Sequence, residues 1–245
     1  MAKKGSNNKQ KRLSVSGARH LQRKAHAWTI RQKPGAHTQD ASVPLGFVVR
    51  DMLKLSNTLR EARQIITKGN ILVDGHVRKS YQFAVGLFDT VSIPSLKKHY
   101  RIVLDHKGRL KTLEASDAMV QSKPSKVIVK KKMPGQKLMI QTHDGKTFRD
   151  AQQSVRVGDS VLIKEGNKIS EHLSLVKGSH VFITGGTHVG EMAQVASIVE
   201  GTMKRDKLVD LIEGKEKFQT TAENVMVIDA NTASWLKTLH KEEAA

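Results

Sequence analysis

The chain has 245 residues, with 42 lysines and arginines against 23 acidic residues, a formal net charge of +19 and no cysteine. The lack of cysteine excludes disulfides, thiol catalysis and cysteine-ligated zinc sites, and an aromatic content of 4% favours several small aliphatic cores over one large core. A chain this basic is expected to bind a polyanion, and nucleic acid is the first candidate because neutralised phosphates release counterions.

An anionic membrane surface is the second candidate partner, and the sequence disfavours it. The chain has no apolar run near the roughly 18 residues that a membrane span requires, and no signal peptide or lipidation motif. We therefore expect a soluble, cytoplasmic protein with no membrane partner.

Residues 1–40 form a basic N-terminal extension with few bulky apolar side chains, so we expect it to be disordered alone and to fold onto RNA. Trp28 lies among basic residues, where it can stack on a base or pack against the neighbouring domain. The expected RNA-binding residues of this segment are Lys3, Lys4, Lys9, Lys11, Arg12, Arg19, His20, Arg23, Lys24, Trp28, Arg31 and Lys33.

Residues 41–94 have the pattern of a small domain with two helices and a hairpin. Pro44 suits the first turn of a helix, and the apolar residues that follow it leave Arg50 and Lys54 on the opposite side. The spacing of Thr58 and Glu61 predicts a capping box at the start of a second helix. The apolar stripe of that helix is expected to comprise Leu59, Ala62, Ile65 and Ile66.

Basic residues flank this stripe, and a tight hairpin follows the second helix. Gly69 is expected to end the helix as a residue without a Cβ can. Asp74-Gly75 predicts a type I′ turn between strands at residues 71–73 and 76–78. The expected RNA-binding residues of the domain are Arg50, Lys54, Arg60, Arg63, Lys68, Arg78 and Lys79.

The run from Thr58 to Val77 resembles the S-four-like RNA-binding domain, also called the αL motif. That family has a capped R-x-x-A-R-x-x-I-x-x-G helix followed by V-x-V-[ND]-G. The residues in register with this pattern are Arg60, Ala62, Arg63, Ile66, Gly69, Val73, Asp74 and Gly75. The resemblance implies that the basic helix and its hairpin grip folded RNA.

Residues 95–172 are expected to form a β-rich central domain, because strand signals dominate them. Strands are expected at residues 100–104 and 127–131, and residues 143–146 are expected to form the turn of a hairpin whose strands are 138–141 and 147–148. Residues 157–163 repeat a turn-then-strand form that also occurs at residues 85–93.

Residues 173–210 resemble the KOW motif, a short β-hairpin element of many ribosomal and transcription-elongation proteins. The residues of the expected loop are Lys177, Gly178, Gly185, Gly186, Thr187 and Gly190. Members often carry Lys or Arg after the third glycine and a further glycine two residues later, where this chain has Glu191 and Ala193. A protein-facing or structural role therefore stands beside direct phosphate contact. Residues 211–245 are expected to form a C-terminal strand and tail.

The order of these parts resembles the small-subunit ribosomal protein S four e family of archaea and eukaryotes. The resemblance implies an α+β multi-module fold with a basic N-terminal extension, a small S-four-like αα-β domain, a β-rich central domain and an SH3-like KOW β-barrel. It also implies a structural constituent of the small ribosomal subunit that binds and clamps 16S-type rRNA. The implied partners are small-subunit rRNA and neighbouring ribosomal proteins, with no cofactor and no small-molecule substrate.

Enzymatic alternatives lack their key residues, so no catalytic residue is assigned. Pseudouridine synthases with this domain have a G-R-L-D motif whose Asp is the nucleophile, whereas residues 108–111 read Gly-Arg-Leu-Lys. Residues 123–126 resemble the lysine loop of tyrosyl-tRNA synthetases only faintly, without a His-x-Gly-His partner. Residues 185–190 have the glycine spacing of a P-loop, but Glu191-Met192 replaces its Lys-Ser/Thr.

Two further expectations concern metal binding and the alternative function. The 11 histidines show no pair at the spacing of a helical metal site, so no metal is expected. The functional alternative is a free-standing RNA-binding regulator or a heat-shock-type RNA chaperone that uses the same domain.

Overall fold

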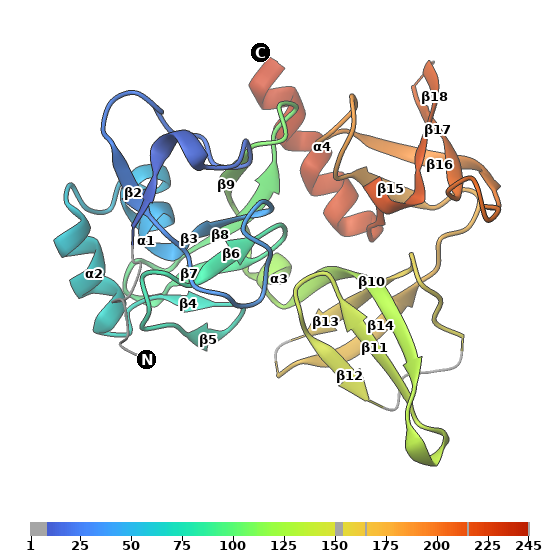
Figure 1. The fold of residues 1–245 in the computed structure, drawn as a ribbon, viewed down its shortest axis with the longest axis horizontal. Coiled ribbons are helices and arrows are strands. Elements are labelled where there is room, and N and C mark those ends of the chain that lie inside the picture. Colours follow the sequence, from blue (N-terminus) through green and yellow to red (C-terminus); the bar gives the residue numbers. More distant parts are fainter. Residues whose placement is uncertain (1–8, 150–153, 165, 215, 245) are drawn as a thin grey trace, which may run out of the picture. The chain divides into compact units, whose positions relative to one another are not determined.

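The computed structural model describes residues 9–149, 154–164, 166–214 and 216–244 (Figure 1). Lys3 and Lys4 lie outside these residues. The chain forms two compact units, one comprising Met1–Asp105 with Arg109–Val120 and the other comprising His106–Gly108 with Gln121–Ala245. No helix within the described residues is long and apolar enough to cross a membrane.

The first unit is built on a five-stranded antiparallel sheet in the order β5-β4-β7-β8-β9 (Figure 1). The strands in chain order are β4 (Leu72–Val73), β5 (His76–Val77), β7 (Thr90–Ile93), β8 (Lys98–Leu104) and β9 (Leu110–Glu114). Two-stranded pairs join β1 (Lys9–Lys11) to β2 (Trp28–Ile30) and β3 (Ser42–Pro44) to β6 (Ala84–Gly86). The helices are α1 (Leu45–Phe47), a π-helical continuation (Val48–Met52), α2 (Leu59–Thr67) and α3 (Asp117–Val120).

The local signals of the second helix and its hairpin are confirmed. The Thr58 hydroxyl accepts a hydrogen bond from the Glu61 amide, and the Glu61 carboxylate accepts one from the Thr58 amide. Gly69 has a φ of 84°, as a helix-ending residue in the left-handed region does. Asp74 and Gly75 have φ values of 50° and 75°, so both central residues of the turn have the sign that type I′ requires.

The expected domain boundary after residue 94 is wrong, because the sheet continues across it. β7 pairs with β8 from Thr90↔Arg101 to Ile93↔Lys98, and β8 then pairs with β9. A short turn that includes Lys97, at a φ of 51°, allows this pairing to continue. The strand expected at residues 100–104 is present, but it belongs to the first sheet and not to the central domain.

The expectation that the N-terminal extension lacks a core and folds only on RNA is wrong for residues 9–40. Ile30 is buried in the core of the first unit, and Leu21 packs against that core. Nε2 of His37 lies 2.9 Å from Oδ2 of Asp89, and both side chains are buried. A few well-placed apolar residues and a buried polar pair fix the segment, although its composition is basic.

The second unit contains two five-stranded antiparallel sheets (Figure 1). The first, in the order β12-β11-β10-β13-β14, comprises β10 (Ser122–Lys132), β11 (Leu138–Thr142), β12 (Thr147–Arg149), β13 (Ser160–Lys164) and β14 (Lys168–Leu173). The second, in the order β18-β17-β16-β15-β19, comprises β15 (His180–Ile183), β16 (Met192–Val199), β17 (Leu208–Glu213), β18 (Glu216–Thr221) and β19 (Val225–Val227).

The hairpin expected at residues 138–148 is confirmed as β11 and β12, but the expected boundary at residue 210 is wrong. β17 crosses that point and pairs with β16 on one side and β18 on the other. The chain then continues through β19 into helix α4 (Ala230–Ala244), which packs beside β15 and buries Leu236. The expected C-terminal strand and tail is therefore the second half of one sheet followed by a helix.

The docking of the extension depends on a glycine opposite His37. A Cβ built on Gly86 would lie 2.5 Å from Cγ and Nδ1 of the His37 ring. We predict that Gly86→Ala lowers the free energy of unfolding by about 1–3 kcal/mol, measured by urea denaturation, because the ring must shift within a packed interior. Gly17→Ala is the control, since a Cβ there meets no atom within 4 Å. Equal stability of the two variants would show that His37 is not held in place.

Candidate nucleic-acid interface

Helix α2 has one buried face and one basic, exposed face. Ala62 and Ile66 are fully buried in the core of the first unit, with Val73 and Val91 of the sheet. Arg60, Arg63 and Lys68 are exposed on the other side of the helix or at its end. Because residues of an amphipathic helix separate by face, burial of the apolar stripe turns these cations toward solvent.

The capping box fixes the start of α2 and also fixes the position of the Glu61 carboxylate. The Glu61 carboxylate accepts hydrogen bonds from the backbone amides of Thr58 and Asn57 at 3.3 and 3.1 Å. The bonds from the Thr58 amide and hydroxyl, followed by the bond from the Asn57 amide, hold the pKa of Glu61 below its ordinary value. Glu61, the acidic residue of α2, is therefore bonded to the backbone at the start of the helix.

Two arginines of this surface are held against aromatic rings. The Arg63 guanidinium lies 5.4 Å from the centre of the Tyr81 ring, and the Arg78 guanidinium lies 4.5 Å from the centre of the Phe83 ring. Such contacts orient the guanidinium plane while leaving N–H donors at its edge for phosphate oxygens. The aromatic residues were not among the expected site residues, and their position just after the hairpin is the signal that identifies them.

The end of α2 approaches the hairpin that follows it. A Cβ built on Gly69 would lie 3.2 Å from Cγ1 of Val77 and 3.9 Å from Cε of Lys79. Lys79 is exposed and is the second residue after β5. Gly69, the residue after Lys68, therefore lies beside the stem of Lys79, although the two lysines are 11 residues apart in the chain.

Arg50 and Lys54 differ from the other cations of this domain. Nε and Nη2 of Arg50 donate to Oδ2 of Asp51 at 3.0 and 2.7 Å, so part of its charge is compensated. Lys54 is exposed, with a left-handed φ of 53°. Lys54 is thus the better placed of the two to meet a phosphate.

Arg19 is the expected RNA-binding residue that the structure removes from the surface. Its side chain is buried, donates to the Ile30 carbonyl at 2.9 Å and lies over the Phe47 ring. Burial lowers the pKa of Arg19 to about 10, partly opposed by the nearby Asp51 carboxylate. Its assignment to RNA is therefore wrong, and Arg19 fastens the extension to the first unit.

The other described cations of the extension remain at or near its surface. The Arg12 guanidinium donates to the Gln22 carbonyl at 2.7 Å, and that of Arg23 to the Val15 carbonyl at 3.3 Å. The residues that are exposed are Lys9, Lys11, His20, Arg23, Lys24, Trp28, Arg31 and Lys33.

Trp28 is 54% exposed and pairs with Lys11 across β1 and β2. Residues paired directly across antiparallel strands have side chains on the same face of the sheet. An indole beside a lysine on an exposed strand suits stacking on an unpaired base, with the lysine near its phosphate.

The glycine loop between β15 and β16 is structurally constrained and poor in cations. Gly186 and Gly190 have left-handed φ values of 95° and 86°, and a Cβ on Gly185 would lie 2.7 Å from Oδ1 of Asn224. Thr187 is exposed in the loop, and Lys177 and Gly178 lie in the turn that precedes β15. His188 and Glu191 face one another across the loop. Residues 184–191 contain no arginine or lysine, so the loop offers no cationic side chain of that kind to a phosphate.

A further basic surface, at the end of the β10–β11 hairpin, was not among the expected site residues. Lys131, Lys132 and Lys137 are exposed there, close to the turn that joins the two strands. The run of three lysines at residues 130–132 is the sequence signal for this surface. Nζ of the first of them, Lys130, donates to the Val155 carbonyl at 2.6 Å.

Residues 123–126, considered as a synthetase-like loop, lie within strand β10. Lys123 is buried, and its Nζ lies 3.2 Å from Oδ2 of Asp144. Nζ of Lys126 donates to the carbonyls of Ala222 and Glu223 at 2.8 and 2.7 Å, and burial lowers the pKa of Lys126 to about 8. Both lysines therefore hold the second unit together and are not presented to a substrate.

Two family models match parts of this chain. The S4 domain model matches residues 48–91, and the model of the ribosomal family S4e matches residues 96–169. The small ribosomal subunit protein eS4 of Archaeoglobus fulgidus is 40% identical over 220 residues, which cover 89% of this chain and 92% of that protein. The chain belongs to the eS4 family of small ribosomal subunit proteins.

Other eS4 proteins match over similar lengths. The eS4 protein of Methanocaldococcus jannaschii is 37% identical over 240 residues, covering 93% of this chain and 96% of that protein. The crystal structure of the 30S ribosomal protein S4e from Thermoplasma acidophilum superposes with a TM-score of 0.69 at 32% identity, covering 79% of this chain and 97% of that one. The family resemblance noted from the order of motifs is confirmed, and the eS4 family is not a class of enzymes.

The exposed indole of this eS4 chain gives a direct test of base stacking. We predict that Trp28→Ala weakens binding to small-subunit rRNA by about 1–3 kcal/mol in a filter-binding titration, because stacking on one base is worth that much. Its free energy of unfolding should change by less than about 0.5 kcal/mol, as for an exposed position. Leu13→Ala, at a position 68% exposed in the same extension, is the control. Equal affinities of both variants and the parent chain would exclude the stacking role.

Proposed function

We propose that this chain is a structural constituent of the small ribosomal subunit that binds and clamps 16S-type rRNA during assembly and translation. The observation that carries the proposal is the basic face of α2 with its adjoining hairpin, in a chain that matches eS4 proteins over about nine-tenths of its length. Phosphate contacts from exposed lysines and arginines position a protein on RNA without requiring a particular base. A cytoplasmic location is part of this proposal.

The clamp is proposed to act through several basic surfaces on one chain. These are the exposed part of the N-terminal extension, the α2 surface and the end of the β10–β11 hairpin. The α2 surface comprises Arg60, Arg63, Lys68, Arg78 and Lys79. When one surface binds, the others act at a high effective concentration, so modest individual affinities combine into tight binding. Lys3 and Lys4 are proposed to add to the first of these surfaces.

The C-terminal part of the chain is proposed to face neighbouring ribosomal proteins. Residues 173–245 carry slightly more acidic than basic residues, unlike the rest of the chain. The β15–β16 hairpin is proposed to be a KOW-type element within an SH3-like sheet, with a structural role. Its left-handed glycines support this proposal, and the acidic Glu191 argues against phosphate contact by its loop.

Sedimentation of cell extract tests the proposed function against a free-standing regulator. A structural constituent is expected to co-migrate with the small subunit at about one copy per particle, and to remain there after a high-salt wash. A pool that stays mainly at the top of the gradient would contradict the proposal. It would favour the alternative of an RNA-binding regulator or RNA chaperone.

The contribution of individual phosphate contacts appears in the salt dependence of binding. We predict that Arg60→Ala and Lys68→Ala each weaken rRNA binding and reduce the slope of log affinity against log salt by about 0.7–0.9. Each substitution removes one phosphate contact, and with it the counterion that this contact releases from the RNA on binding. Lys217→Ala, an exposed lysine on β18, should leave the slope unchanged. Slopes that are equal in all three variants and the parent chain would show that α2 does not face phosphates.

A further inference from the structure

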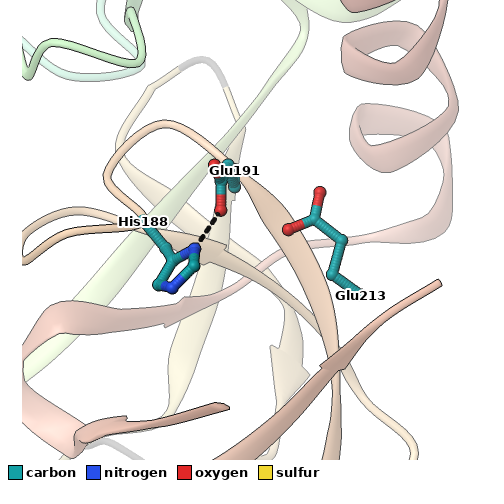
Figure 2. A group of neighbouring side chains, drawn as sticks. All are labelled: His188, Glu191 and Glu213. Atoms are coloured by element: carbon teal, nitrogen blue, oxygen red, sulfur yellow. Dashed lines mark hydrogen bonds and ion pairs between the residues drawn. The ribbon is translucent and has the colours of Figure 1, made fainter. Parts of the chain in front are cut away.

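A histidine and two glutamates meet at one end of the C-terminal sheet (Figure 2). His188 lies in the glycine loop between β15 and β16, Glu191 directly precedes β16, and Glu213 is the last residue of β17. One potential ligand atom from each residue lies within 4.8 Å of the others. The carboxyl group of Glu213 points toward the other two side chains.

The imidazole of His188 is held in a defined orientation. Its Nδ1 lies 2.7 Å from Oε2 of Glu191, as the dashed line in Figure 2 shows. Its ring stacks on Phe218 of β18, with a centroid separation of 4.0 Å and an interplanar angle of 15°. Nδ1 is therefore the nitrogen that faces the carboxylates, and a metal ion would bind it in place of the proton shared with Glu191. Because its neighbours fix the ring, this exchange costs little rotamer freedom.

The electrostatic environment is locally negative in a chain whose net charge is +19. Glu216 pairs directly opposite Glu213 at the end of the β17–β18 hairpin, which adds a third carboxylate near the cluster. A cation between these carboxylates would offset their mutual repulsion, which the single imidazole offsets only in part.

We propose that His188, Glu191 and Glu213 form a binding site for a divalent transition-metal ion, with zinc the best fit. One nitrogen and two carboxylate oxygens suit zinc, whose sites combine histidine with Asp or Glu. An imidazole nitrogen disfavours magnesium and calcium, which prefer all-oxygen sites. Two of the three side chains are partly buried and Glu213 is exposed, so an ion can enter from solvent.

The bound ion would join the glycine loop to the end of β17. His188 and Glu191 are close together in the sequence, at the glycine loop. Glu213 lies 22 residues after Glu191, at the end of β17. A metal bridge across such a separation restricts the loop in the folded chain. This role fits a loop that carries no lysine or arginine for RNA.

Equilibrium dialysis of the chelator-treated full chain against Zn²⁺ in phosphate-free buffer tests the site. One tight site per chain is expected, with His188→Ala and Glu213→Gln each weakening it by roughly tenfold or more. His172→Ala is the matched control, because Nε2 of His172 also lies 2.8 Å from a carboxylate, that of Asp159, yet no group of three ligands is found there among the described residues. Circular dichroism confirms that each variant is folded.

Co²⁺ provides a second readout that does not depend on affinity alone. A visible absorption band of bound Co²⁺ is expected in the parent chain and in His172→Ala, and its loss is expected in His188→Ala. The proposal is overturned if no stoichiometric Zn²⁺ site is found, if His172→Ala weakens binding as much as His188→Ala, or if Mg²⁺ binds as tightly as Zn²⁺. These measurements contain no RNA, so their failure would leave the proposed ribosomal function unaffected.

Discussion

The proposed RNA-binding surface of the chain depends on the burial of one side of helix α2. Ala62 and Ile66 are inaccessible to solvent because they are buried in a core to which α1, its π-helical continuation and the sheet of the first unit all contribute. Because an α-helix has 3.6 residues per turn, this burial fixes the orientation of the helix about its axis. In that orientation Arg60, Arg63 and Lys68 point outward. The apolar core thus determines which charges are available, although it makes no contact with RNA itself.

The same core also holds the N-terminal extension in place, and this affects the free energy with which the proposed clamp would bind RNA. A disordered arm would lose conformational entropy on binding RNA. Residues 9–40 instead share the core of the first unit through Ile30, Arg19 and the His37–Asp89 pair. The exposed cations of the extension are therefore largely preorganised within the unit that carries α2, and less binding energy is lost to ordering them.

Local features were predictable from sequence, whereas long-range ones were not. The capping box of Thr58 and Glu61 and the Asp74-Gly75 turn involve residues close in the chain, so their spacing alone defines them. The burial of Arg19 depends on Ile30 and Phe47, and the pairing of β8 with β7 depends on a short turn between them. Charge patterns cannot distinguish an arginine in a core from one on a surface, and strand patterns do not state which sheet a strand joins. For this reason the capped helix and hairpin that carry the proposed site were predictable from sequence, while the limits of the extension and of the central domain were not.

Contact between the exposed face of α2 and rRNA in the small subunit can be tested directly because the chain has no cysteine. A single cysteine at Gln64, on the exposed side of α2, can carry an iron chelate that generates hydroxyl radicals after incorporation into the subunit. We predict strand cleavage at a compact set of small-subunit rRNA nucleotides from Gln64→Cys, and weaker cleavage from Lys217→Cys on β18. Absence of cleavage from Gln64→Cys in fully assembled subunits, with strong cleavage from Lys217→Cys, would contradict it.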